Sequence, residues 1–141
     1  MTGVEWVSML SPERYRHGLP ATAAELAAAE KALDATFPSD LRELYVVTDG
    51  VFDLPGEWFV IWPLADVVDR NQADWLTYPH SPTRSDLVAF GDDGTGDPFC
   101  IARDGGGAVF YWSPIDDTAT WLANTITDFW TRWHGDTLPP H

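Results

Sequence analysis

Cysteine and positive charge are what this sequence has least of. Its 141 residues include one cysteine, Cys100, so no internal disulfide can form and the hydrophobic core has to hold the fold. Lysine and arginine together number 8 against 22 acidic residues, which gives a formal net charge of −14. Nucleic-acid phosphates and anionic membrane surfaces repel such a chain, so neither is expected as a partner and a basic protein is favoured. The same charge would also serve solubility alone.

Long hydrophobic runs and catalytic motifs are missing as well. No apolar run approaches the ~20 residues of a membrane-spanning helix, and no signal-like segment opens the chain, so we expect a cytoplasmic protein. The four histidines show no zinc-ligand spacing, and neither G-x-S-x-G nor a phosphate-binding glycine motif occurs. Carboxylates are numerous enough for a glycosidase-like pair, but nothing in their order singles out two. We therefore expect no catalytic residue, no cofactor and no metal.

Aromatic residues, in contrast, are abundant, and many of them fall in short runs that favour strands. The chain has 8 Trp, 7 Phe and 4 Tyr, which supply a bulky core for a single domain of 141 residues. Residues 87–90, 99–103 and 108–112 are rich in valine, isoleucine and aromatic residues, and turns of glycine and aspartate separate them. We expect these runs to pair as antiparallel strands at the centre of the fold, with Cys100 in the core.

Two helices are expected before this sheet. Thr22 and Glu25 form a capping box, in which each side chain satisfies a free amide of the first helical turn. Pro38 is expected to end the first helix and to start the second, which ends at Gly50 because glycine accepts a left-handed cap conformation. The apolar stripe of the first helix recurs at helical spacing and consists of Leu26, Ala29, Leu33 and Phe37.

A third helix is expected at the C-terminal end. Apolar residues recur there at helical spacing, Gly135 marks the end, and Asp116, Asp117 or Thr118 is the expected N-cap. The sequence therefore predicts an α+β fold, with an antiparallel or mixed sheet flanked by two N-terminal helices and one C-terminal helix. The residues of the C-terminal apolar stripe are Leu122, Ile126, Phe129, Trp130 and Trp133.

The remaining segments give weaker patterns. Residues 58–64 are expected to form a strand that pairs with 51–54 through a turn at Pro55-Gly56-Glu57. Residues 65–86 match no clear pattern: an irregular helix is expected at 65–75 and a proline-containing loop at 78–84. We expect a loosely packed lead-in with one short helix at residues 1–18 and a flexible tail at 135–141.

The acidic turn between the first two central strands is a candidate metal site. Asp92, Asp93 and Asp97 place three carboxylates within six residues, and calcium and magnesium prefer oxygen ligands. However, the spacing of an EF-hand and its terminal glutamate are both missing. Hairpin turn chemistry accounts for the same residues without a metal, so a structural role is preferred.

Two motifs and the order of the segments resemble a known superfamily. Residues 22–50 read T-A-A-E-L…A-E-K-A-L…F-P-S-D-L-R-E-L-Y…T-D-G, and residues 90–100 read F-G-x-D-G-x-G-D-x-F-C. With the strand at 109–112 and the terminal helix through Trp133, this order resembles the SUKH superfamily across residues 19–134. That superfamily includes fungal cell-wall assembly regulators and many bacterial immunity proteins of polymorphic toxin systems.

The resemblance implies a fold and a class of function. It implies an α+β domain without common catalytic machinery, here residues 1–141 with a core at 19–134. We expect a non-catalytic protein-binding domain, an immunity protein that neutralises a cognate toxin, itself a basic domain, by direct binding. The alternative is a regulatory or scaffold module of a housekeeping pathway such as cell-wall assembly, and a metal-dependent enzyme comes third. The sequence indicates no oligomeric state.

The candidate partner-binding residues lie on two loops and one strand. Asp53 and Glu57 flank the turn before the strand 58–64, and the acidic turn lies elsewhere on the sheet. If both loops emerge at the same edge, they form an acidic rim around an aromatic patch. Toxin specificity is expected in residues 65–86 and the tail, which depart from the superfamily pattern. The candidate residues are Asp53, Glu57, Trp58, Trp62, Asp92 and Asp93.

Overall fold

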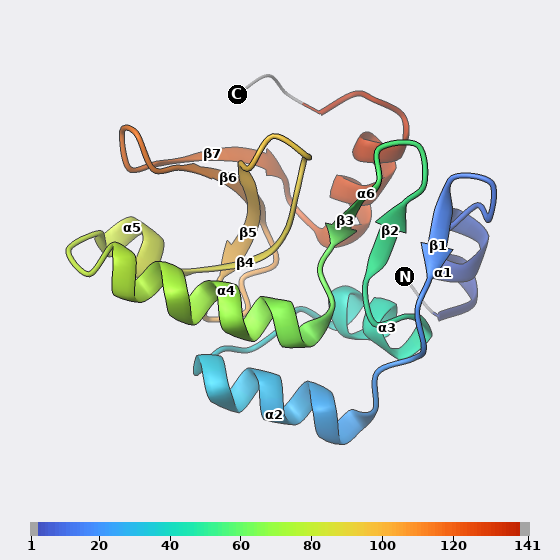
Figure 1. Ribbon diagram of the computed structural model, residues 1–141, viewed down its shortest axis with the longest axis horizontal. Helices are drawn as coiled ribbons and strands as arrows, with labels where there is room; N and C mark the ends of the chain where they lie inside the picture. Colours follow the sequence, from blue (N-terminus) through green and yellow to red (C-terminus); the bar gives the residue numbers. More distant parts are fainter. Residues whose placement is uncertain (1–2, 139–141) are drawn as a thin grey trace.

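The computed structural model describes residues 3–138, and its centre is an antiparallel sheet of seven strands. The strands follow one another in chain order, so the sheet is a meander (Figure 1). This confirms the expected α+β class. The strands are β1 (Tyr15–His17), β2 (Val51–Asp53), β3 (Trp58–Ile61), β4 (Leu87–Asp92), β5 (Pro98–Ala102), β6 (Val109–Ser113) and β7 (Thr118–Ala123).

Within residues 3–138, six helices pack around the sheet. The expected helices are present as α2, α3 and α6, and α2 and α4 lie side by side (Figure 1). Helix α6 packs on the sheet through Phe129, whose ring lies 4.6 Å from that of Phe99. No helix within residues 3–138 is long and apolar enough to cross a membrane. The helices are α1 (Gly3–Met9), α2 (Ala23–Leu33), α3 (Ser39–Val47), α4 (Leu64–Thr77), α5 (Pro82–Ser85) and α6 (Ile126–His134).

The capping box at the start of α2 is confirmed. The Glu25 amide donates to Thr22 Oγ1 at 3.1 Å, and the Thr22 amide donates to Glu25 Oε1 at 3.0 Å. The helix ends at Leu33, before Pro38, because Asp34 adopts a left-handed conformation with φ 49°. Glu30 then accepts a hydrogen bond from the Phe37 amide, which fixes the link to α3.

The N-terminal segment is part of the core, so the expectation of a loosely packed lead-in is wrong. Trp6, Leu10 and Tyr15 are 0–1% exposed. The Trp6 indole donates to the Asp40 carbonyl at 2.9 Å, and β1 pairs with β2. Large apolar side chains within residues 3–17 therefore pack against the sheet and α3.

The expected start of the C-terminal helix is also wrong. Residues 118–123 form strand β7, which pairs with β6, and α6 begins after Thr125, whose hydroxyl accepts from the Asp128 amide. The threonines and Trp121 favour a strand, and the turn before them closes a hairpin. Gly135 ends α6 as expected. Of the expected flexible tail, residues 139–141 lie outside the described residues, and the Thr137 amide donates to the Arg132 carbonyl.

The segment that matched no pattern is more regular than expected. Helix α4 continues without interruption to Thr77, and a short helix, α5, occupies part of the expected loop. The first turn of α4 has no cap from its own sequence neighbours. Instead, the Leu64 amide donates to Asp49 Oδ1 at 2.8 Å. Because this capping carboxylate comes from the α3–β2 connection, local sequence does not reveal it.

Candidate partner-binding groove

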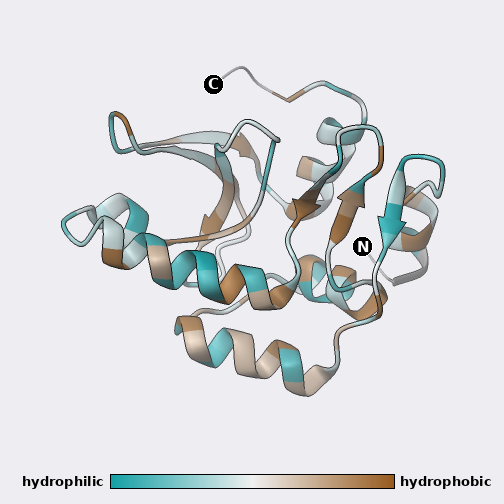
Figure 2. Ribbon diagram, viewed as in Figure 1, coloured by the Kyte–Doolittle hydropathy of each residue, from teal (hydrophilic) through white to brown (hydrophobic). Residues whose placement is uncertain are grey.

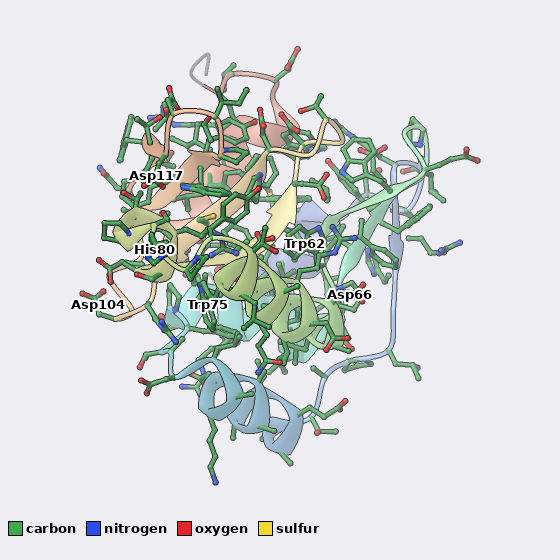
Figure 3. The ribbon with its side chains drawn as sticks, turned by 60° about the vertical axis from the view of Figure 1, so that its left-hand side comes forward. Trp62, Asp66, Trp75, His80, Asp104 and Asp117 are labelled. Atoms are coloured by element: carbon green, nitrogen blue, oxygen red, sulfur yellow. The ribbon has the colours of Figure 1, made fainter. Side chains whose placement is uncertain are left out.

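A groove of about 340 Å³ lies between α4 and the turns of the β4–β5 and β6–β7 hairpins. Figure 3 labels Trp62 just before α4, and His80 and Asp117 near the other end of that helix. The groove contains indole rings, carboxylates and one arginine. Its lining residues are Trp62, Arg70, Ala73, Asp74, Tyr78, Asp92, Gly96, Pro98, Trp112 and Pro114.

Asp92 organises the first end of the groove. The Trp62 indole donates to Asp92 Oδ2 at 2.9 Å, and the Trp58 indole donates to the Asp92 carbonyl at 3.0 Å. Trp62 is 5% exposed and lines the groove, whereas Trp58 is half-buried and contacts Asp92 without lining the groove. The residue that begins β3 and the one just after its end therefore both contact Asp92, where the acidic turn begins.

Arg70 covers this end of the groove. Its Cζ lies 4.4 Å from the centroid of the Trp62 ring, and Nη1 lies 3.8 Å from Asp92 Oδ2. Its side chain is 56% exposed, so solvent screens both interactions and neither holds it firmly. The Trp62–Asp92 pair is thus a place where a guanidinium already rests.

The other candidate residues of the two loops have different surroundings. Glu57 is exposed in the β2–β3 turn, with φ 60°. Asp93 Oδ1 accepts from the Thr95 amide and hydroxyl at 2.9 and 2.6 Å, which is turn chemistry. Asp53 is only 3% exposed: it accepts from the Gly56 amide at 3.0 Å and lies 3.7 Å from Arg14. Asp53 therefore holds the β2–β3 turn from inside the protein.

At the far end of the groove, the α4–α5 connection meets the β6–β7 turn. The Tyr78 ring stands edge-on to Trp112 with 5.0 Å between centroids. Asp117 Oδ1 accepts from the Trp112 indole at 3.0 Å and from the Ser81 hydroxyl. A second hollow of about 330 Å³ shares Tyr78, Trp112 and Pro114 with the groove and extends it past these residues.

A buried arginine supports the groove from below. Arg84 is fully buried and donates to the Leu87 carbonyl and to Asn71 Oδ1, both at 2.8 Å, and to Asp74 Oδ2 at 3.1 Å. Asn71 in turn pairs with both the amide and the carbonyl of Ala89 at 2.8 Å. Side chains thus complete the edge of β4 where β3 no longer reaches it.

This network was missed in the sequence, although a signal for it exists. Asn71, Asp74 and Tyr78 recur at helical spacing, so a regular helix places all three on one face. A polar stripe of that kind is typical of a solvated surface. Only the position of Arg84, fixed by α5, shows that the stripe faces the sheet edge.

Burial shifts the pKa of two side chains of the sheet. Burial raises the pKa of the Cys100 thiol to about 12, so it stays protonated and unreactive at neutral pH. Burial, with the nearby carboxylates of Asp93 and Asp97, also raises the pKa of Tyr111. Within residues 3–138 no group of three or more His, Cys, Asp or Glu could hold a metal ion.

The fold is an α+β domain built on an antiparallel meander, with an aromatic and acidic groove on its surface. The chain belongs to the SMI1/KNR4 family (SUKH-1), which matches residues 20–132. This match confirms the resemblance to the SUKH superfamily and is consistent with a non-catalytic binding domain. No curated protein matches the chain.

Proposed function

We propose that this chain is an immunity protein that neutralises a cognate toxin by binding it in the groove. The observation that carries the proposal is the contact between Trp62 and Asp92 at one end of that groove, where the Trp58 indole also donates to the Asp92 carbonyl. Indole rings beside a carboxylate favour a cationic side chain, and the net charge of −14 favours a basic partner. Binding there would occlude the toxin without any chemical step.

Arg70 indicates how the partner is held. Its guanidinium lies over Trp62 and near Asp92, but it is half-exposed and weakly fixed. An arginine or lysine of the toxin replaces it, stacking on the indole and pairing with the carboxylate. Glu57 and Asp93 add negative charge on the β2–β3 and β4–β5 turns, whereas Asp53 acts through the shape of the β2–β3 turn.

Co-expression with a toxin tests this proposal. A toxin domain encoded by a neighbouring gene is expressed in bacterial cells with and without this chain, and growth is followed. We expect growth arrest by the toxin alone and growth when the chain is present, and expect the two purified proteins to form a complex. Asp92→Asn should weaken the rescue, and Asp104→Asn, which changes the same charge on the exposed β5–β6 turn, should not.

The alternative function is a regulatory or scaffold module of a housekeeping pathway such as cell-wall assembly. Membership of the SMI1/KNR4 family supports it equally, because the superfamily includes both kinds of protein. The two functions differ in their outcome. A chain that rescues no toxin, but whose deletion alters growth in the absence of any toxin, is a regulator. The single cysteine is compatible with the cytoplasm as the place of action in either case.

A further inference from the structure

Strand β7 is an edge of the sheet, and its outer half is unprotected. Within the described residues no strand pairs with its far side, and residues 118–121 are all exposed, with Trp121 at 42%. Proteins blunt such edges with charged residues, prolines or bulges. The segment Thr-Ala-Thr-Trp contains no charge and no proline, and its pairing with β6 is regular up to Trp121.

The opposite edge of the same sheet shows the usual protection. Strand β1 is only three residues long and carries Arg16 and His17, and it is hydrophilic where β2 and β3 are hydrophobic (Figure 2). The Arg16 guanidinium lies over the Phe52 ring at 4.3 Å, and His17 Nε2 lies 3.0 Å from the Leu10 carbonyl. The sheet is therefore blunted at one edge and left open at the other.

The charges beside β7 are mainly negative. A hollow of about 260 Å³ borders Thr118 and Thr120, and it is lined by Asp97 and Asp116. Hydrogen bonds, first from the Thr118 hydroxyl, lower the pKa of Asp116, so it stays charged at neutral pH. The cation Arg132 lies 5.6 Å from the Trp121 ring and pairs with Asp128.

We propose that β7 is a docking edge that takes an extended basic segment of a partner protein as an added strand. The free edge supplies backbone hydrogen bonds, which fix the segment beside residues 118–121. Side chains alternate along a strand, so Thr118 and Thr120 share one face and Ala119 and Trp121 the other. Lysines or arginines at every second position of the segment meet Asp97 and Asp116, and apolar residues between them cover Trp121.

A second copy of this chain is a poorer occupant than a basic segment. Each copy carries a net charge of −14, so two copies repel each other over any shared edge. The inference goes beyond the groove and holds whether the partner is a toxin or a housekeeping protein. Figure 1 shows the β6–β7 turn at the outer side of the molecule, away from α1 and α2, where a partner strand has access.

A pair of peptides tests the docking edge. The probe is a capped heptapeptide of alternating lysine and valine. The control peptide has glutamate in place of each lysine. Hydrogen exchange of the isotope-labelled protein is followed by NMR. We expect the lysine peptide to slow exchange of the outward amides of residues 118–121 by about tenfold, and the glutamate peptide to leave them unchanged. Resonance shifts confined to other strands would overturn the proposal.

Two further arms separate strand pairing from charge attraction. A lysine peptide with alternate N-methyl groups keeps its charge but cannot pair along the edge, so it should not protect these amides. Equal protection by that peptide would contradict the proposal. Asp116→Asn should weaken binding of the lysine peptide, whereas Asp104→Asn, on the β5–β6 turn, should leave that binding unchanged. Equal effects of the two substitutions would mean attraction by overall charge.

Sedimentation of the free protein completes the test. A monomer at all concentrations is expected, and a dimer that Asp116→Lys strengthens would mean that a second copy occupies the edge. The peptides contain no toxin sequence, so their failure leaves the groove proposal intact. Loss of toxin rescue on substitution of Asp92 likewise leaves the docking edge intact.

Discussion

At the scale of single residues, Arg84 is a buried charge that depends on its hydrogen-bond partners. Its guanidinium is fully buried, and its carboxylate partner Asp74 is 37% exposed. Arg84→Met removes the charge and the hydrogen bonds that Arg84 donates to the Leu87 carbonyl and to Asn71 Oδ1, which keeps only the Ala89 amide as a donor. We expect a loss of about 3 kcal/mol in the free energy of unfolding, measured by urea denaturation. Arg42→Met, at a 48% exposed arginine paired with Glu30, is the control and should cost under about 1 kcal/mol.

Arg70 is the residue whose removal should help binding. Because its guanidinium occupies the Trp62–Asp92 pair, Arg70→Ala frees that pair for the partner's cation. We expect the toxin to bind about 2–5-fold more tightly, as measured by calorimetry. This gain corresponds to the free energy of one exposed cation–π contact, which the partner's cation no longer has to displace. Arg42→Ala should change nothing. If Arg70→Ala abolished binding, Arg70 would itself contact the partner.

Cys100 gives the protein a dependence on alkaline pH. The folded thiol has a pKa of about 12 against 9.0 for an ordinary cysteine, because burial disfavours the thiolate. Above pH 9 the unfolded chain loses this proton and the folded chain keeps it, so the free energy of unfolding should fall between pH 9 and 12. Cys100→Ala should make that fall shallower in urea denaturation at several pH values. An unchanged slope would assign the dependence to other groups, such as Tyr15, whose pKa is also raised by burial to about 12.

At the scale of elements, the helices and strands specified by neighbouring residues can be predicted from the sequence, and those that depend on distant residues cannot. Neighbouring residues specify the capping box of α2 and the central strands, so both can be predicted. The start of α6 was misplaced because Leu122 happens to stand four residues before Ile126, although Thr125 and Asp128 carry the true cap. Helix α4 depends on a cap from Asp49, and the Trp62–Asp92 contact depends on how β3 meets β4. Neither follows from local sequence.

The junction of β3 and β4 leaves no room for an added side-chain atom at Gly91. The two strands pair at Ile61–Gly91, and a Cβ on Gly91 would lie 2.0 Å from the Val60 carbonyl oxygen. Since backbone cannot yield as a side chain can, Gly91→Ala should cost about 3 kcal/mol in thermal unfolding. Gly96→Ala is the control: its φ of +99° is strained, but nothing lies within 4 Å of the added atom. That variant should cost about 1 kcal/mol, and equal losses would contradict the importance of the junction.

At the scale of the whole molecule, net charge should govern how fast a partner arrives. With −14 charges and a groove lined by Asp74 and Asp92, association with a basic toxin should slow by about tenfold or more between 0.05 and 0.5 M salt. Dissociation should change much less, because short-range contacts control it. Surface plasmon resonance measures both rates. An association rate that does not respond to salt would mean that the charge serves solubility alone.

The narrow junction between β3 and β4 also links partner binding to heat resistance. Trp62 follows one half of the sheet and Asp92 ends the first strand of the other half, so a partner seated on both holds the halves together. A partner that binds only when the two halves of the sheet are together raises the melting temperature, and the increase grows with the partner's concentration. At a hundredfold excess over the dissociation constant the gain is about 2.7 kcal/mol. A melting curve can therefore detect the natural partner of this domain without any assay of toxicity or growth.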